Sequence, residues 1–172
     1  NCHRFLDETR FTSINFINTF NCLSVTSFKE FLEGILELRE KWSKENQYAM
    51  GWEVPEQRIW FDIPVLRNPA WQTIQVLPSE YQSYLEEAIQ FMESHKANEE
   101  YVDYRGFKDF EIAKAKRNLD LMKKELPQQE LIRNRADFYK FFTEHDKRRH
   151  TNFLATFPEM INFWQQCEEA EA

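Results

Sequence analysis

Polar side chains that can bind a ligand follow two short apolar segments of this chain. Asn18, Thr19 and Asn21 come at the end of the first segment, and Asp62 and Arg67 belong to the second or follow it. Amide, hydroxyl, carboxylate and guanidinium groups can together hydrogen-bond the polar atoms of a cofactor or substrate. We therefore predict these five as cofactor-binding residues.

Each of these side chains also has a structural interpretation. The three residues after the first segment can bind backbone groups that are left over where a strand ends. Asp62 can form a buried partnership with Arg58 or Arg67 instead of meeting a ligand. The sequence leaves both interpretations open, and it identifies no catalytic residue.

Several other kinds of site have no signature here. With 3 glycines, the chain lacks the Gly-rich loops of dinucleotide-binding and P-loop proteins. No Ser–His–Asp order and no paired-carboxylate motif stands out. His145 and His150 are five residues apart, whereas helical metal ligands lie three or four apart, so we predict no metal site. The run Lys147–His150 can bind a phosphate or end a helix, where positive charge is favoured by the dipole.

Composition limits the partners of the chain. A length of 172 residues suffices for one real core, and 16 phenylalanines indicate that rings fill much of it. The net charge of −7 argues against a nucleic-acid binder. No apolar run is long enough for a membrane span, so we predict a cytoplasmic protein without membrane contact. The 3 cysteines are too few and too scattered for a disulfide framework.

Periodicity predicts strands first and helices later. Period-2 alternation indicates strands at Phe11–Phe20 and Arg58–Leu66, and helical spacing of apolar residues runs from Phe28 to about Lys44. The segment Trp71–Leu77 is predicted as a third strand or an extended connection. Polar loops are expected at Glu45–Gln57 and Lys96–Arg105. Further helices are predicted from Pro78 to about His95 and over 107–124, 129–146 and 152–168. Thr151 or Asn152 can cap the last of these, and Pro158 predicts a break near Thr156, which can cap the new helix with Glu159 as its N3 partner.

This order predicts an α/β, helix-rich fold. A strand–helix–strand unit implies a parallel pair, and two or three strands make a poor independent sheet when both faces need cover. We therefore expect residues 1–78 to be the last strands of a partial (βα) barrel and residues 79–172 to be a C-terminal helical extension. Polar side chains at the carboxyl ends of the strands would then be the functional ones. The open strand edge also predicts self-association.

The segment Asp137–Glu159 packs five phenylalanines and a tyrosine around charges of both signs. It resembles the C-terminal end of twitch-domain radical SAM proteins. The likeness extends over most of 11–167, through Asn18–Asn21 to Phe31–Leu32, Phe61–Arg67, Pro69–Gln72, Gln75–Pro78, Phe107–Glu111 and Phe138–Glu159. The five phenylalanines can form a partner groove or, as we favour, core packing.

The resemblance implies iron–sulfur chemistry in an intact protein. Such proteins hold a 4Fe–4S cluster on a C-x₃-C-x₂-C loop and bind S-adenosylmethionine at it. Cys2, Cys22 and Cys167 do not have that spacing, so no cofactor is expected in this chain itself. We expect a fragment that is inactive alone and whose partner is the missing N-terminal half of the barrel. The alternative is an autonomous α-rich interaction domain without catalysis.

Overall fold

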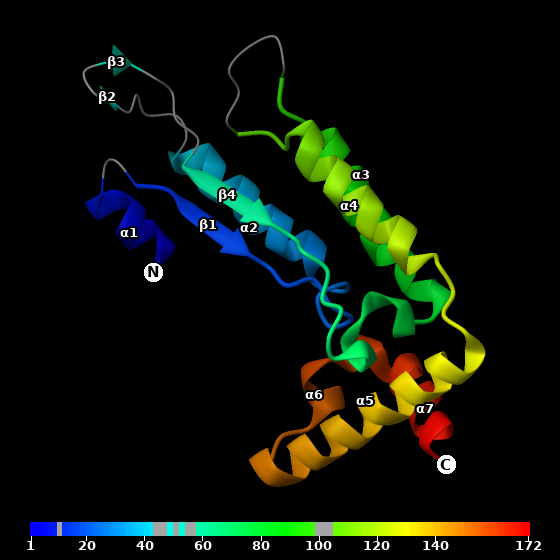
Figure 1. The fold of residues 1–172 in the computed structure, drawn as a ribbon. Coiled ribbons are helices and arrows are strands. Elements are labelled where there is room, and N and C mark those ends of the chain that lie inside the picture. Colours follow the sequence, from blue (N-terminus) through cyan, green and yellow to red (C-terminus); the bar gives the residue numbers. More distant parts are fainter. Residues whose placement is uncertain (10–11, 43–47, 50–51, 54–57, 99–104) are drawn as a thin grey trace.

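The computed structural model describes all of the chain except residues 10–11, 43–47, 50–51, 54–57 and 99–104 (Figure 1). Short strands come early and helices dominate the rest. The α-helices are α1 (Cys2–Glu8), α2 (Phe28–Trp42), α3 (Gln82–Ser94), α4 (Asp109–Met122), α5 (Gln128–Arg149), α6 (Phe153–Thr156) and α7 (Ile161–Glu171). The strands are β1 (Ile14–Ile17), β2 (Tyr48–Ala49), β3 (Trp52–Glu53) and β4 (Ile59–Asp62). The 3₁₀ helices are η1 (Ala70–Gln72), η2 (Ile74–Val76), η3 (Ser79–Tyr81) and η4 (Pro158–Met160).

The predicted strand–helix–strand unit is confirmed. β1 and β4 pair in parallel, with Ile14 opposite Ile59 and Ile17 opposite Asp62. Burial alternates along β1 as the period predicts, with Ile14 half-buried and Ile17 exposed. Both strands are shorter than expected, because beyond them the pairing continues only as an isolated bridge between Phe20 and Val65. The strand predicted to begin at residue 11 has that end outside the described residues.

Helix α2 covers one face of this small sheet. Its apolar stripe buries Phe28, Leu32 and Ile35, and its Phe31 ring contacts Phe16 of β1 and Phe61 of β4 at centroid distances of 6.2 and 5.8 Å. Helices α3 and α4 lie alongside as an antiparallel pair (Figure 1). In that view the strands lie in front of α2, so their other face points toward the viewer.

Three segments differ from the sequence prediction. Residues 71–77 are not a strand but lie mostly in η1 and η2, and hydrogen bonds such as Val76 N–H to Thr73 O close the turns. A short apolar run does not distinguish a strand from 3₁₀ turns, because Ile74 and Val76 can be buried in either structure. The expected loop 45–57 contains the antiparallel pair β2–β3. Helix α1 was not predicted, and its one buried residue is Leu6. Most of the expected loop Lys96–Arg105 lies outside the described residues.

The C-terminal helices enclose a cluster of rings centred on Phe138. Its ring contacts Phe142, Phe153 and Phe163 at centroid distances of 4.6, 5.5 and 4.8 Å. The helix predicted over 152–168 is interrupted at Pro158, as the fixed backbone of proline requires. Asn152 caps α6 through the Ala155 N–H, as predicted. The prediction that Thr156 caps the new helix is wrong. The new helix η4 begins at Pro158, so its N-cap residue is Phe157, which makes no side-chain cap hydrogen bond.

Helix α5 runs further than predicted and ends with His150 in the left-handed conformation, at φ 54°. The charged residues of this region stabilise the turn that follows. Asp146 accepts hydrogen bonds from the Thr151 hydroxyl and the Phe153 N–H, both at 2.7 Å.

No helix in the described part of the chain is both long enough and apolar enough to cross a membrane.

Two glycines give opposite expectations for alanine substitution. A Cβ on Gly106 would lie 2.4 Å from the backbone nitrogen of Ala97, because the neighbouring Phe107 forms a parallel bridge with Lys96. Gly106→Ala should therefore lower the free energy of unfolding by about 1–3 kcal/mol. Gly34 lies inside α2, and a methyl group at its Cα would have no neighbour within 4 Å, so Gly34→Ala should raise that free energy by roughly 0.5–1 kcal/mol. Urea unfolding of both variants measures the difference, and equal effects would contradict the clash.

Candidate functional site

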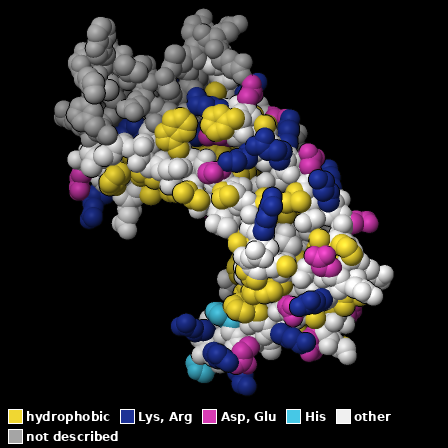
Figure 2. Space-filling view, in the orientation of Figure 1, with side chains coloured by type: hydrophobic (Ala, Val, Ile, Leu, Met, Phe, Trp, Pro, Cys, Tyr) yellow, Lys and Arg dark blue, Asp and Glu magenta, His cyan; other side chains and the backbone are white. Residues whose placement is uncertain are grey.

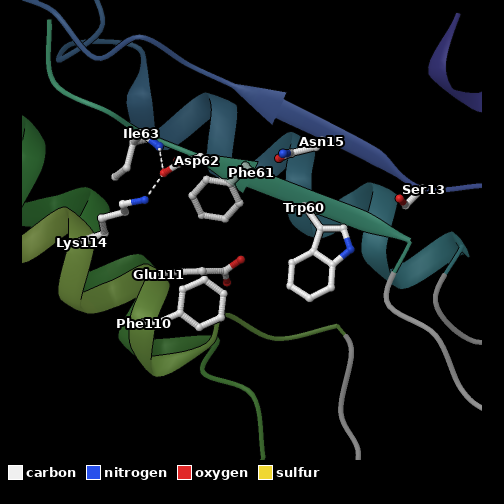
Figure 3. Close-up of a pocket in the computed structure, with 9 residues that line it drawn as sticks. All are labelled: Ser13, Asn15, Trp60, Phe61, Asp62, Ile63, Phe110, Glu111 and Lys114. Atoms are coloured by element: carbon white, nitrogen blue, oxygen red, sulfur yellow. Dashed lines mark hydrogen bonds and ion pairs between the residues drawn. The ribbon is translucent and has the colours of Figure 1, made fainter.

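A pocket opens on the face of the β1–β4 sheet opposite α2, beside helix α4 (Figure 3). Its volume is about 360 Å³. Three elements supply the lining: Ser13 and Asn15 from the β1 region, Trp60 to Ile63 from β4 and its end, and Phe110, Glu111 and Lys114 from α4. Because side chains alternate along a strand, Asn15, Trp60 and Asp62 project from this face while Ile59 and Phe61 are buried. The pocket therefore combines polar groups with aromatic rings.

Asp62 is one of two acidic residues in the described lining of this pocket, and its partner is Lys114. Its Oδ1 accepts hydrogen bonds from the Lys114 ammonium and, at 2.8 Å, from the Ile63 N–H. The hydrogen bond from Lys114 holds the pKa of this carboxyl below its ordinary value, outweighing the opposite effect of burial. The structural interpretation named Arg58 or Arg67 as the partner of Asp62, but the structure gives Lys114 instead, and ligand binding by Asp62 stays a prediction. Lys114 was missed because it lies 52 residues away, on a helix face that sequence spacing does not relate to β4.

Asp62 should contribute stability that depends on pH. Because its pKa is lowered in the folded chain, the contribution is present above the unfolded pKa, near 3.8, and is lost as pH falls through the folded value. The ion pair is more than a third exposed, so we expect at most about 1 kcal/mol at pH 7. Urea unfolding of Asp62→Asn should show a difference from the parent chain at pH 7 that shrinks toward pH 3. A difference that grows on acidification would contradict this assignment.

A buried ion pair lies directly behind the pocket. Arg39 of α2 contacts Glu111 of α4 at 2.6 Å between Nη2 and Oε1, and the two side chains are 0% and 1% exposed. Arg39 also donates to the Ile59 and Gly106 carbonyls, at 3.1 and 3.2 Å. Glu111 accepts a further bond from the Lys108 N–H at 2.9 Å. The pair therefore joins α2, β4 and α4 and fixes the wall of the pocket.

The polar residues predicted after β1 lie at the same end of the sheet as Asp62. Asn21 forms a local turn, since its Oδ1 accepts the Leu23 N–H at 2.9 Å and its amide donates to Thr19 O at 3.0 Å. Asn18 is half-buried, with Ser24 Oγ at 3.5 Å from its Oδ1. These contacts fit the strand-end interpretation of Asn21, whereas ligand binding by Asn18 and Thr19 stays a prediction.

The two arginines near β4 have different surroundings. Arg58 is buried and donates to the backbone carbonyls of Leu6, Thr9 and Thr12, so it anchors the N-terminal helix. Arg67 is exposed and precedes the cis peptide bond between Asn68 and Pro69. It does not line the pocket of Figure 3. A cofactor-binding role for Arg67 stays a prediction.

The cysteines do not fit an iron–sulfur cluster. Cys22 and Cys167 are fully buried free thiols, and burial raises the pKa of both, that of Cys167 to about 12. A cluster needs thiolates, which such surroundings disfavour. Cys2 lies apart in α1. The described residues contain no group of three or more side chains that could hold a metal ion.

In the basic run Lys147–His150, Lys147, Arg148 and Arg149 belong to the last turn of α5, where a helix favours positive charge, and His150 is its C-cap. Arg148 pairs with Glu144 at 2.5 Å across one helical turn. A shallow depression along this helix is lined by Lys140, Phe141, Glu144, His145, Arg148 and Arg149. All of these side chains are exposed, so no buried polar group marks a ligand site there.

Comparisons of the chain with protein-family models, with curated proteins and with solved structures gave no match.

Proposed function

We propose that this chain is the C-terminal part of a radical SAM-like enzyme, in which it supplies the last two strands of a partial barrel. The observation that carries the proposal is the asymmetry of the β1–β4 sheet. Helix α2 covers one face, whereas no helix in the described part of the chain lies across the opposite face, which carries Asn15, Ile17, Trp60 and Asp62. In an α/β barrel the helices lie outside and the open face lines the interior.

The two edges of the sheet support the same interpretation. Along β1, the Ile14 and Asn18 N–H groups donate to Arg58 and Asp62 carbonyls of the neighbouring segment. The N–H groups of Asn15 and Ile17 therefore point away from β4. Within the described part of the chain no strand pairs with that outer edge of β1. A preceding barrel strand would pair there.

Helix α4 lies on the β4 side of the sheet. The Asn118 amide donates to Ile63 O at 3.2 Å, directly after β4, and Lys114 pairs with Asp62. α4 thus occupies the position next to the last strand, as a closing helix of an open barrel would. The fold is compatible with β4 being the final strand and with the remaining strands being added on the β1 side.

The role of this chain would be to form one wall of the reaction chamber. Figure 2 shows hydrophobic side chains along the inner side of the bend between the sheet and the C-terminal helices. Ile17 of β1 is 68% exposed, which is high for an apolar residue of a strand. Covering this face would exclude water from the chamber. The described residues hold no cluster site, so we assign no chemical step to this chain.

The test is to sequence the gene upstream of the Asn1 codon and to express the longer protein that the open reading frame encodes. We expect the extension to encode C-x₃-C-x₂-C, and the longer protein to take up iron and sulfide anaerobically and to cleave S-adenosylmethionine. The 172-residue chain treated in the same way should remain colourless, because its thiols do not fit a cluster. The control is the longer protein with alanine at its three motif cysteines.

The proposal is contradicted if the upstream reading frame lacks the C-x₃-C-x₂-C motif, and two further outcomes would also contradict it. One is a start codon immediately before the Asn1 codon, which would favour an autonomous α-rich interaction domain. The other is a stoichiometric cluster on the 172-residue chain alone.

A further inference from the structure

The pocket of Figure 3 brings a positive and a negative charge together beside aromatic rings. The Asp62 and Lys114 side chains are 39% and 37% exposed, so both heads reach the solvent of the pocket. Trp60 and Phe110 are 37% and 53% exposed, although large aromatic side chains are usually covered. The pocket therefore presents both charged groups and aromatic rings to a ligand.

Among the residues that the structure describes, the charges that face the pocket amount to one pair. The described lining contains three titratable side chains, Asp62, Glu111 and Lys114. Glu111 is neutralised by Arg39, since both carboxylate oxygens bind the guanidinium at 2.6 and 3.0 Å. One carboxylate and one ammonium therefore remain, and a lowered Asp62 pKa keeps that carboxylate ionised at neutral pH. A ligand that complements them carries one ammonium and one carboxylate.

We propose that this pocket binds a free aromatic α-amino acid. The Asp62 carboxylate accepts hydrogen bonds from the ligand ammonium, the Lys114 ammonium donates to the ligand carboxylate, and the ligand ring packs against Phe110 and Trp60. The volume of about 360 Å³ is at the lower end for small-molecule pockets, as suits one amino acid. A residue inside a peptide has no charged ammonium or carboxylate on its Cα, because both groups are part of amide bonds. The free amino acid is therefore the better complement.

In the intact enzyme such an amino acid would be the substrate class, and this role of the ligand rests on the proposed function. Binding itself depends on residues of this chain. The pocket is open on one side, so we expect millimolar affinity from the 172-residue chain.

The test titrates the chain with L-tryptophan, followed by isothermal titration calorimetry and by amide chemical shifts. Three probes each lack one feature: tryptamine has no carboxylate, indole-3-propionic acid has no ammonium, and L-alanine has no ring. We expect each to bind roughly 10-fold more weakly than tryptophan, with the tryptophan shifts centred on residues 60–63 and 110–114. The proposal is overturned if tryptophan shows no saturable binding, or if a truncated probe binds equally well.

Single-residue variants test whether tryptophan binds at this pocket and not elsewhere on the molecule. Phe110→Ala should weaken tryptophan binding by roughly 3- to 10-fold, since its ring is exposed and its loss leaves the fold intact. Lys114→Gln should weaken tryptophan but not tryptamine. Phe141→Ala, an exposed ring on α5, is the matched control and should change nothing. Equal effects at Phe110 and Phe141 would refute the site, whereas a missing cluster motif upstream would refute only the proposed function.

Discussion

Replacing Glu111 with alanine is expected to lower the free energy of unfolding by about 3–5 kcal/mol, because it leaves the Arg39 guanidinium buried without its counter-charge. Arg39 is fully buried, and its guanidinium lies 5.5 and 5.8 Å from the ring centroids of Phe61 and Phe107. These rings cannot replace the carboxylate, whose two oxygens accept two of the guanidinium hydrogen bonds. Urea unfolding followed by circular dichroism measures the loss.

The matched control is Glu86→Ala. Glu86 of α3 pairs with Lys123 at 2.8 Å, but both side chains are about half exposed, at 52% and 45%. Exposed pairs contribute roughly 0–1 kcal/mol, so this variant should remain close to the parent chain. An equal loss in the two variants would show that burial does not set the strength of the Arg39–Glu111 pair.

A double replacement tests the mechanism. Arg39→Met combined with Glu111→Leu removes both buried charges and keeps apolar volume, so it should be more stable than Glu111→Ala alone. A double variant less stable than the single one would mean that Arg39 stabilises the fold mainly through its bonds to the Ile59 and Gly106 carbonyls.

Truncating Phe138 is expected to cost about 3–5 kcal/mol, the range for a fully buried phenylalanine. Phe138 has no exposed surface and joins α5 to α6 and α7 through Phe153 and Phe163. The cavity left by Phe138→Ala would lie among rings that cannot collapse into it easily. Thermal unfolding of the variant should show a large drop in the midpoint.

Two comparisons make this prediction specific. Phe141→Ala should cost much less, since Phe141 is 45% exposed although its ring lies 4.5 Å from Trp71. Arg148→Ala with Arg149→Ala should have little effect, because these side chains are exposed at the end of α5. If the arginine pair proved more damaging than Phe138→Ala, the charged block would be a ligand or ionic site and not the end of a helix.

Much of the local structure could be predicted from the sequence. The apolar stripe of Phe28, Leu32 and Ile35 indicates α2 because residues three and four apart share a helix face. The alternation around Phe16 indicates β1 for the corresponding reason with period 2. Pro158 predicts a helix break, since its ring excludes the preceding helical hydrogen bond. These signals act over a few residues, so the chain alone determines them.

The candidate site could be predicted only in part. The sequence indicates Asp62 as a polar residue at a strand end, but it indicates neither the partner Lys114 nor the aromatic wall that includes Phe110. The periodicity around residues 110–114 indicates a helix but not which of its faces meets β4. The contact arises because α4 packs beside β4.

Only the tertiary structure decided which distant groups meet. Arg39 and Glu111 are 72 residues apart, and each one alone looks like an exposed charge on a helix. Likewise Glu159, predicted as a local cap, accepts instead from the Thr26 hydroxyl, 133 residues away. Local spacing fixes a residue's face on its own element, whereas its partner depends on how several elements pack around one core. For that reason the sequence determined the β1–β4 strands and most of the helices of this protein, and the packing of α2 and α4 against β4 determined its buried ion pair and its pocket.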